Sequence, residues 1–219
     1  MFRLTCLTAL VLLLCFSGVR AYEAGDVSLA LGAVYSPIMI GTDFGEVNVN
    51  DSTAGICHDA QLGKPGVGGE VQLRYFVAPR LALGLSAEDQ YFSSDVASGF
   101  ELNTRTRMRQ YMLFAHYFLP EFSSYRIYVP VAAGAAHTDF SMDFREVGAN
   151  KQHFTYTGFS GYLGIGAEKD LSARVSIGAE ARYHLNRFHD SRTRNDGHRV
   201  TVYPRANFFS FVLRVICKI

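Results

Sequence analysis

Seven arginines fall into two groups whose spacing could bind phosphate. Three alternate with other residues in one short stretch and four surround one polar segment, and the set comprises Arg105, Arg107, Arg109, Arg187, Arg192, Arg194 and Arg199. Arginine holds a phosphate through two parallel hydrogen bonds, so both groups are candidate contacts for a phosphorylated ligand. The alternative is a solvated loop whose arginines pair with Asp190 and Asp196.

Residues of catalytic or metal-binding type otherwise occur singly. His189 precedes Ser191 by two positions, which could pair a base with a nucleophile, but such a pair is common in polar segments. Cys57-His58 is a weak nucleus for a zinc site, and residues 63–66 lack the phosphate-binding frame of a P-loop. The acids within residues 43–59 do not follow the spacing of an EF-hand. We expect no enzymatic activity, no cofactor and no metal.

The elements that must position these residues are strands, because apolar residues recur at every second position along nearly the whole chain. Segment 173–186 is the clearest, with an apolar face from Ala173 to Leu185 and a face of charges and glycine between. Eight such segments occur, at about 27–35, 67–75, 81–88, 105–119, 125–138, 163–168, 173–186 and 206–219. In 105–119 and 125–138 both faces carry apolar residues, so the pattern does not assign their inward face.

The charged positions of these strands would face the inside of a barrel. They are Glu70, Arg74, Glu88, Glu168, Arg174, Glu180, Arg182, His184 and Arg214, with Lys218 near the rim. The interior of an eight-stranded barrel is just wide enough for side chains to fill, and unpaired charges there would be costly. We therefore expect ion-pair networks that plug the barrel. The alternative is a gated ion path, or a proton-sensitive element at His184.

The connections alternate between long and short. Residues 37–65, 94–103, 139–152 and 188–203 are long and polar, whereas the turns near Pro79, Pro120 and Asp170 are short. This asymmetry is typical of outer-membrane barrels, which have short periplasmic turns and long outer loops. A soluble barrel could show the same alternation within its strands. The loop asymmetry, the glycine-rich polar face and the final strand at the chain end favour the membrane barrel.

Aromatic residues lie near the predicted strand ends, where the interfacial girdles of such a barrel would be. We expect Tyr35, Tyr91, Phe140, Tyr156, Tyr183 and Phe209 toward the outer rim, and Tyr75, Tyr117 and Tyr128 toward the inner one.

The N-terminal residues predict export. Arg3 precedes an apolar run, and Val19-x-Ala21 supplies a signal-peptidase site, so residues 1–21 are a predicted signal peptide and residues 22–219 one barrel domain. Removing Arg3 and Arg20 from 21 basic and 20 acidic residues leaves a net charge of about −1, which gives no support for nucleic-acid binding. Cys57 and Cys217 would lie at opposite ends of the barrel and are not expected to pair.

The chain resembles the small outer-membrane β-barrel proteins of the OmpA, OmpX and opacity type. The resemblance rests on the eight-strand pattern, on the segment from Arg74 to Leu85 around the first short turn, and on the terminal strand. It implies an all-β, eight-stranded antiparallel up-and-down transmembrane β-barrel in the outer membrane of a Gram-negative-type bacterium. It also implies that the last strand is read by the barrel assembly machinery, although Ile219 stands where the family usually has Phe.

The functional expectation follows from the plugged interior. We expect a monomeric barrel with a structural, envelope-integrity or adhesin-like role that contacts outer-membrane lipid and lipopolysaccharide and displays loops to an unknown ligand. A narrow porin-like channel is the second hypothesis. The third is a lipid A-modifying enzyme, because His189 and Ser191 are similar to a motif of the lipid A deacylases. The acid those enzymes use downstream is missing, since residues 197–219 contain no Asp or Glu.

Overall fold

The computed structural model describes residues 22–43, 46–49, 52–55, 65–97, 101–120, 125–144, 152–193, 199–202 and 205–219. Within these ranges no helix is long and apolar enough to cross a membrane. The regular elements there are the strands β1 (Val27–Asp43), β2 (Glu46–Val49), β3 (Ser52–Gly55), β4 (Gly66–Ala78), β5 (Leu81–Ala97), β6 (Glu101–Phe118), β7 (Tyr125–Phe144), β8 (Gln152–Asp170), β9 (Val175–Thr193), β10 (Arg199–Val202) and β11 (Arg205–Lys218).

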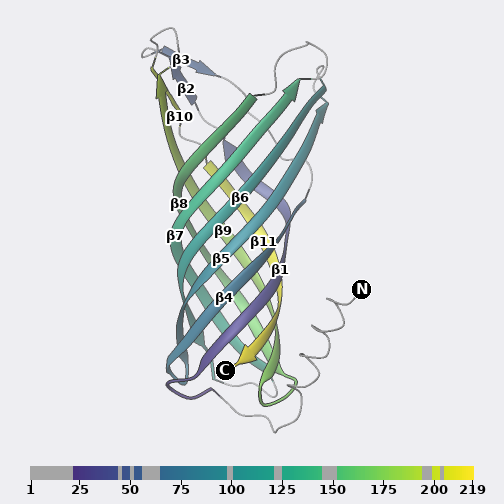
Figure 1. The fold of residues 1–219 in the computed structure, drawn as a ribbon, viewed down its shortest axis with the longest axis vertical. Helices are drawn as coiled ribbons and strands as arrows, with labels where there is room; N and C mark the ends of the chain where they lie inside the picture. Colours follow the sequence, from purple (N-terminus) through teal and green to yellow (C-terminus); the bar gives the residue numbers. More distant parts are fainter. Residues whose placement is uncertain are drawn as a thin grey trace.

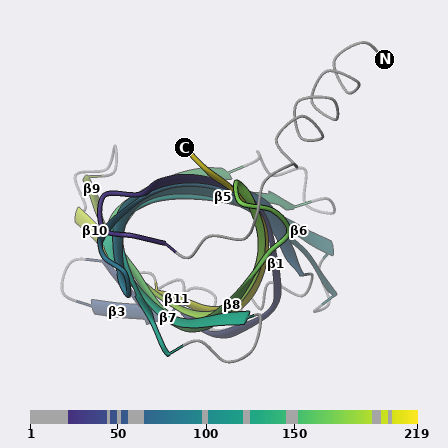
Figure 2. The same ribbon diagram turned by 90° about the horizontal axis from the view of Figure 1, so that it is seen from below.

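Eight long strands form a closed barrel. Neighbours follow the order β11-β1-β4-β5-β6-β7-β8-β9, every pair is antiparallel, and β9 pairs with β11 to close the ring (Figures 1 and 2). The predicted eight-stranded up-and-down barrel is therefore confirmed. The short strands β2, β3 and β10 lie at the end that we call outer, and the C-terminus lies at the inner end (Figure 1).

The outside of the wall is apolar. In β4 the side chains of Glu70, Gln72 and Arg74 are buried, while the intervening Val71, Leu73 and Tyr75 are about half exposed. The exposed apolar residues of β4 run from Val67 to Val77, and at about 3.3 Å per residue on a strand tilted by about 40° they rise roughly 25 Å. That is the height of the hydrocarbon band of an outer-membrane barrel. The exterior is matched to lipid.

The strands reach further toward the outer end than the sequence pattern predicted. Residues 94–97 pair with 101–104, and residues 139–142 pair with 152–155, so much of two predicted long loops is strand. The first predicted loop contains the β2–β3 hairpin, and β2 pairs with β10 from the last. Polar and apolar residues do not alternate consistently in these four stretches, so the period-2 pattern did not identify them as strand.

Glycines on the inward face make room for large side chains on neighbouring strands. Tyr128 of β7 lies directly opposite Gly166 of β8, and a Cβ atom on Gly166 would stand 2.3 Å from the Tyr128 ring. The absence of a side chain at Gly166 thus lets the Tyr128 ring lie flat across the wall and reach the centre of the barrel.

We predict that Gly166→Ala destabilises the barrel by about 1–3 kcal/mol, the usual cost of overpacking, because the ring of Tyr128 must move. Denaturant-induced unfolding in lipid vesicles measures the change. Gly69→Ala is the matched control, because Gly69 faces outward and its nearest neighbouring atom is 3.7 Å from the added Cβ. Equal stability of the two variants would contradict this account of Gly166.

Candidate functional site

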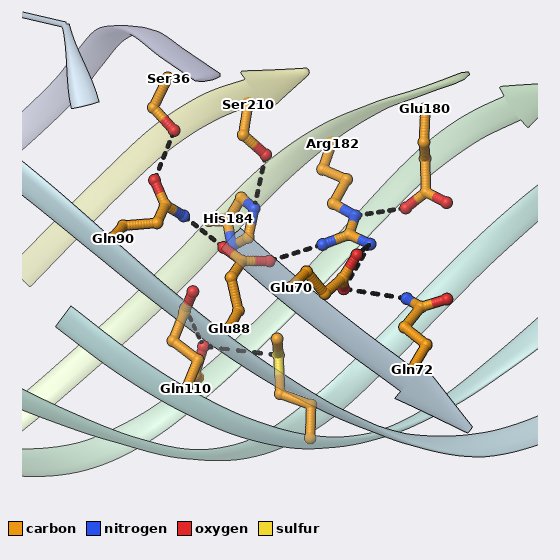
Figure 3. Close-up of polar contacts among 12 residues, drawn as sticks. Ser36, Glu70, Gln72, Glu88, Gln90, Gln110, Glu180, Arg182, His184 and Ser210 are labelled. Atoms are coloured by element: carbon orange, nitrogen blue, oxygen red, sulfur yellow. Dashed lines mark hydrogen bonds and ion pairs between the residues drawn. The ribbon is translucent and has the colours of Figure 1, made fainter. Parts of the chain in front are cut away.

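The centre of the barrel holds one arginine that contacts three glutamates. Arg182 of β9 donates through Nε to Glu180 on its own strand, through Nη1 to Glu88 of β5 at 2.6 Å, and through Nη2 to Glu70 of β4 at 2.7 Å (Figure 3). The side chains of all four residues are fully buried. Because β9 stands across the interior from β4 and β5, these ion pairs span the lumen.

A second arginine completes this cluster from β11. Arg214 donates through Nε to Glu70 at 2.9 Å and through Nη1 to Glu180 at 2.6 Å. The hydroxyl of Tyr128 donates to Glu180 at 2.8 Å. Two glutamines give further donors to the carboxylates, Gln72 to Glu70 and Gln90 to Glu88 (Figure 3). Three carboxylates thus face two guanidiniums and a set of neutral donors, which we call the central cluster.

A second cluster lies nearer the inner end. Arg74 of β4 pairs with Glu168 of β8 and donates to Ser28 at 3.0 Å. Asp170 forms ion pairs with Arg126 at 2.5 Å and with Lys218 at 3.4 Å. Here three cations face two carboxylates, so this inner cluster and the central cluster together contain five acids and five bases. The interior formed by the two clusters is electrically balanced, which lowers the cost of burying its charges.

Tyr22 closes the inner mouth. Only 3% of its surface is exposed, and its ring stacks on Phe76 at 3.8 Å between centroids. The guanidinium of Arg126 and the ammonium of Lys218 each lie 4.3 Å from the ring centre, within cation–π range. Burial raises the pKa of the Tyr22 hydroxyl to about 12, with Glu168 adding to the shift, so the hydroxyl stays neutral and accepts a hydrogen bond from Arg74.

Aromatic and amide side chains fill the remaining interior. His116 of β6 is fully buried, 4.7 Å from the Tyr128 ring. Toward the outer end, Gln110 donates to Ser160 at 2.6 Å and to Asn186 at 2.9 Å, bridging three strands.

The structure brings eight of the nine predicted interior charges into the barrel. Seven of them belong to the two clusters, namely Glu70, Arg74, Glu88, Glu168, Glu180, Arg182 and Arg214. His184 is also buried, but it hydrogen-bonds Ser210 at 2.8 Å (Figure 3). Its ring stacks on Phe208, and it does not join an ion pair. Among the residues that the structure describes, His184 has no charged partner within hydrogen-bond distance.

The prediction for Arg174 was wrong. Arg174 is exposed and lies in the turn before β9, which begins at Val175. The hydroxyl of Ser172 accepts hydrogen bonds from the backbone N–H groups of Arg174 and Val175, so the turn continues through Arg174. The alternation of β9 had been extended too far toward the turn.

Two aromatic placements were also wrong. Tyr128 and Tyr156 were expected at the lipid interfaces, but both are buried. The sequence also missed Tyr22, His116, Arg126, Asp170 and the glutamines of the interior. Polar residues at even positions of β6 and β7, such as Gln110 and Arg126, could have identified the inward face. The odd-numbered arginines of β6 obscured it.

The structure describes the two predicted groups of outer arginines only in part. Arg105, Arg107 and Arg109 face outward on β6, and Arg187 is exposed on β9, three strands away. Arg194 lies outside the described residues, as do the side chains of Arg192 and Arg199.

The candidate chemical motifs are only partly described. His189 is exposed on β9, whereas the side chains of Asp190 and Ser191 lie outside the described residues, as does Cys57. Cys217 is a free thiol on β11. Among the described residues, no group of three or more metal-binding side chains occurs. The unpaired state of Cys57 stays a prediction.

A closed antiparallel barrel with an apolar exterior and a charged interior defines the class of outer-membrane barrels. The chain belongs to the outer membrane protein beta-barrel domain family, whose model matches residues 8–213. A search of curated proteins gave no match.

Among solved structures, the barrel is similar to the outer membrane protein OprG of Pseudomonas aeruginosa, with 12% identity and a TM-score of 0.52 over 90% of this chain and 98% of that chain. Ail, the attachment invasion locus protein of Yersinia pestis, matches with 11% identity and a TM-score of 0.46 over 86% and 99% of the two chains. The OprG match shows a shared fold.

We predict that Arg182→Met destabilises the protein by about 3–5 kcal/mol, because three buried carboxylates lose their shared partner. Denaturant unfolding in vesicles measures the change. Arg174→Met is the control and is expected to stay within about 0.5 kcal/mol of wild type, since Arg174 is exposed. A large loss for Arg174→Met would restore Arg174 to the interior network.

Proposed function

We propose that this protein is a non-conducting, non-catalytic barrel of the bacterial outer membrane, with a structural or surface-interaction role. One observation carries the proposal: Arg182 is fully buried and joins β9 to Glu70 and Glu88 on the opposite wall. An ion that crossed the barrel would have to displace this guanidinium and separate it from carboxylates in a medium of low dielectric, which is costly.

Filling at several levels supports the same proposal. Below the central cluster lies the inner cluster, capped by the Tyr22 ring, which Arg126 and Lys218 both contact. Above it, Gln110 bridges to Asn186, and Asn186 donates to the backbone of Ala206 on β11. Side chains from opposite or alternate strands thus meet at each level. A role on the outer surface then remains for the parts of the chain beyond the apolar band.

A narrow channel is the second candidate, and unpaired hydroxyl groups in the interior favour it. Ser86, Thr106 and Thr138 are buried hydroxyls whose oxygens have no hydrogen-bond partner among the described residues. Such groups could line a polar path if the central cluster rearranged. The channel therefore requires Arg182 to move, whereas the closed barrel does not.

The proposal includes the route to the membrane. Residues 1–21 would be removed as a signal peptide, leaving Tyr22 at the inner mouth. β11 would then serve as the recognition element for the assembly machinery, because Phe209, Phe211 and Leu213 alternate along its exposed face. We further propose that the barrel works as a monomer, since the eight long strands close the wall without a second copy.

We predict that the purified, folded wild-type protein shows no steady conductance in planar bilayers. The variant Glu70→Ala/Glu88→Ala/Arg182→Ala should show intermittent conductance, because it removes the contacts by which Arg182 joins β9 to β4 and β5 and leaves the Glu180–Arg214 pair balanced, while the Arg74–Glu168 pair still crosses the lumen. Arg80→Ala/Arg174→Ala, at the inner turns, is the control and should stay silent, since both side chains are exposed.

The wild-type recording decides the proposal by itself. Steady nanosiemens-scale conductance from wild-type protein would favour the channel, even if the triple variant failed to fold. Heat-modifiability on a gel shows which variants are folded before they are recorded.

A further inference from the structure

The outward face of β5, β6 and β7 changes abruptly from apolar to charged along the strands. In register, Leu85, Leu113 and Ala133 form one row across the three strands. Two rows nearer the outer end, the same positions hold Asp89, Arg109 and His137. The strands are direct neighbours (Figure 1). Cations therefore stand immediately above the apolar band on this part of the wall.

We propose that this face binds a phosphorylated, acylated glycolipid of the outer leaflet, with its phosphates at Arg105, Arg107 and Arg109 and one acyl chain in the apolar groove below. The inference rests on the proposed outer-membrane location, and it does not depend on whether the lumen conducts. In this proposal the phosphates of the lipid contact the arginines, and its acyl chain lies in the adjoining groove on the same three strands.

The charged end is held in an outward position. Arg107 pairs with Asp89 at 2.6 Å and lies 5.1 Å from the centre of the Tyr91 ring. Arg109 pairs with Asp139, which also accepts from Thr155 at 3.2 Å. These contacts fix the guanidiniums while leaving them in reach of solvent, since the Arg107 and Arg109 side chains are 44% and 33% exposed.

The charge balance at this end favours an anion. Among the side chains that the structure describes on this part of the wall, Arg105, Arg107 and Arg109 outnumber the carboxylates of Asp89 and Asp139 by one. Asp89 occupies Nε and Nη2 of Arg107, and a guanidinium has five N–H donors, so donors remain for a phosphate. Exposed ion pairs contribute at most about 1 kcal/mol to stability, so folding alone gives little reason for this row of arginines.

The apolar end is a pair of shallow grooves. They measure about 480 and 600 Å³ and share Leu85, Leu113 and Ala133 in their lining. Leu113 stands clear of the wall with 68% of its surface exposed, while Ala133 beside it leaves a furrow. A straight acyl chain fits such a furrow between leucine side chains, because dispersion contacts need a surface that follows the chain.

The two ends together select the ligand. A soluble polyanion would use the arginines and leave the grooves empty, whereas a lipid without phosphate would do the reverse. A glycolipid of the outer leaflet carries phosphates at the height of the arginines and acyl chains directly below. Arg109, Tyr111 and Leu113 are successive outward residues of β6, so one lipid molecule can contact both the arginines and the grooves.

Binding of diphosphorylated lipid A to the folded full-length protein in phosphatidylcholine nanodiscs tests the proposal. Native mass spectrometry reports the bound fraction. We expect Arg105→Gln/Arg107→Gln/Arg109→Gln to weaken binding tenfold or more, because charge-assisted hydrogen bonds to phosphate are lost. Arg187→Gln, three strands away on β9, is the control and should bind like wild type.

The groove is tested separately by filling it. Ala133→Leu should weaken binding of lipid A several-fold and leave binding of its deacylated phosphorylated disaccharide unchanged. Ala33→Leu, on the outward face of β1, is the matched control. Heat-modifiability and the unfolding midpoint confirm that each variant is folded.

Equal lipid A binding by wild type and the triple arginine variant would overturn the proposal. The proposal would also be overturned if the deacylated disaccharide or dextran sulfate displaced lipid A at equal phosphate or sulfate concentration. Binding would then depend on charge alone. Neither outcome affects the closed lumen, because these substitutions lie on the outer face and the conductance of the wild-type barrel is measured independently.

Discussion

The buried guanidinium of Arg182 is the interaction on which the interior depends. It brings together Glu180, Glu88 and Glu70, three carboxylates that would repel one another without it. Removing such ions from water costs several kcal/mol each, so the cluster is favourable only when nearly every donor and acceptor is used. Arg214, Tyr128 and the glutamines supply the remaining donors. The strands that carry these groups must therefore meet in one register, which makes the cluster a device for specifying barrel closure.

The same constraint explains the small residues of the wall. A narrow interior can hold arginine and tyrosine side chains only if the positions beside them are nearly empty. Gly166 leaves space for the Tyr128 ring, and a Cβ atom added to Gly32 of β1 would stand 3.1 Å from Cγ of Arg214. Both of these large side chains of the interior therefore need a glycine on a neighbouring strand to make room for them. Outside, where lipid adapts to any shape, leucine and valine need no such partners.

The sequence predicted the fold better than the site, and particular strands show why. In β9, glutamate, arginine and histidine alternate with apolar residues, so the inward positions of Glu180, Arg182 and His184 could be read directly. In β6 and β7 the inward face carries Met, Phe and Tyr as well as Gln and His, so apolar residues occur on both faces and the period-2 pattern is ambiguous. Partnerships across the lumen, such as Arg74 with Glu168, depend on strand tilt and register, which no local pattern encodes. Tyr22 was beyond any strand pattern, because it enters the barrel from the segment before β1.

The buried and the exposed arginines of this barrel have different roles. Arg74, Arg182 and Arg214 are enclosed and pair with buried carboxylates, so releasing any one of them would leave buried acids short of a partner. Arg107 and Arg109 form pairs of similar length at the surface, where water and salt screen the attraction and each pair stabilises the fold only slightly. A phosphate can therefore compete for the outer arginines at little energetic cost, whereas the inner arginines are committed to the fold. Because the charges of the interior are balanced and paired, we place the proposed ligand recognition on the outer surface of the barrel.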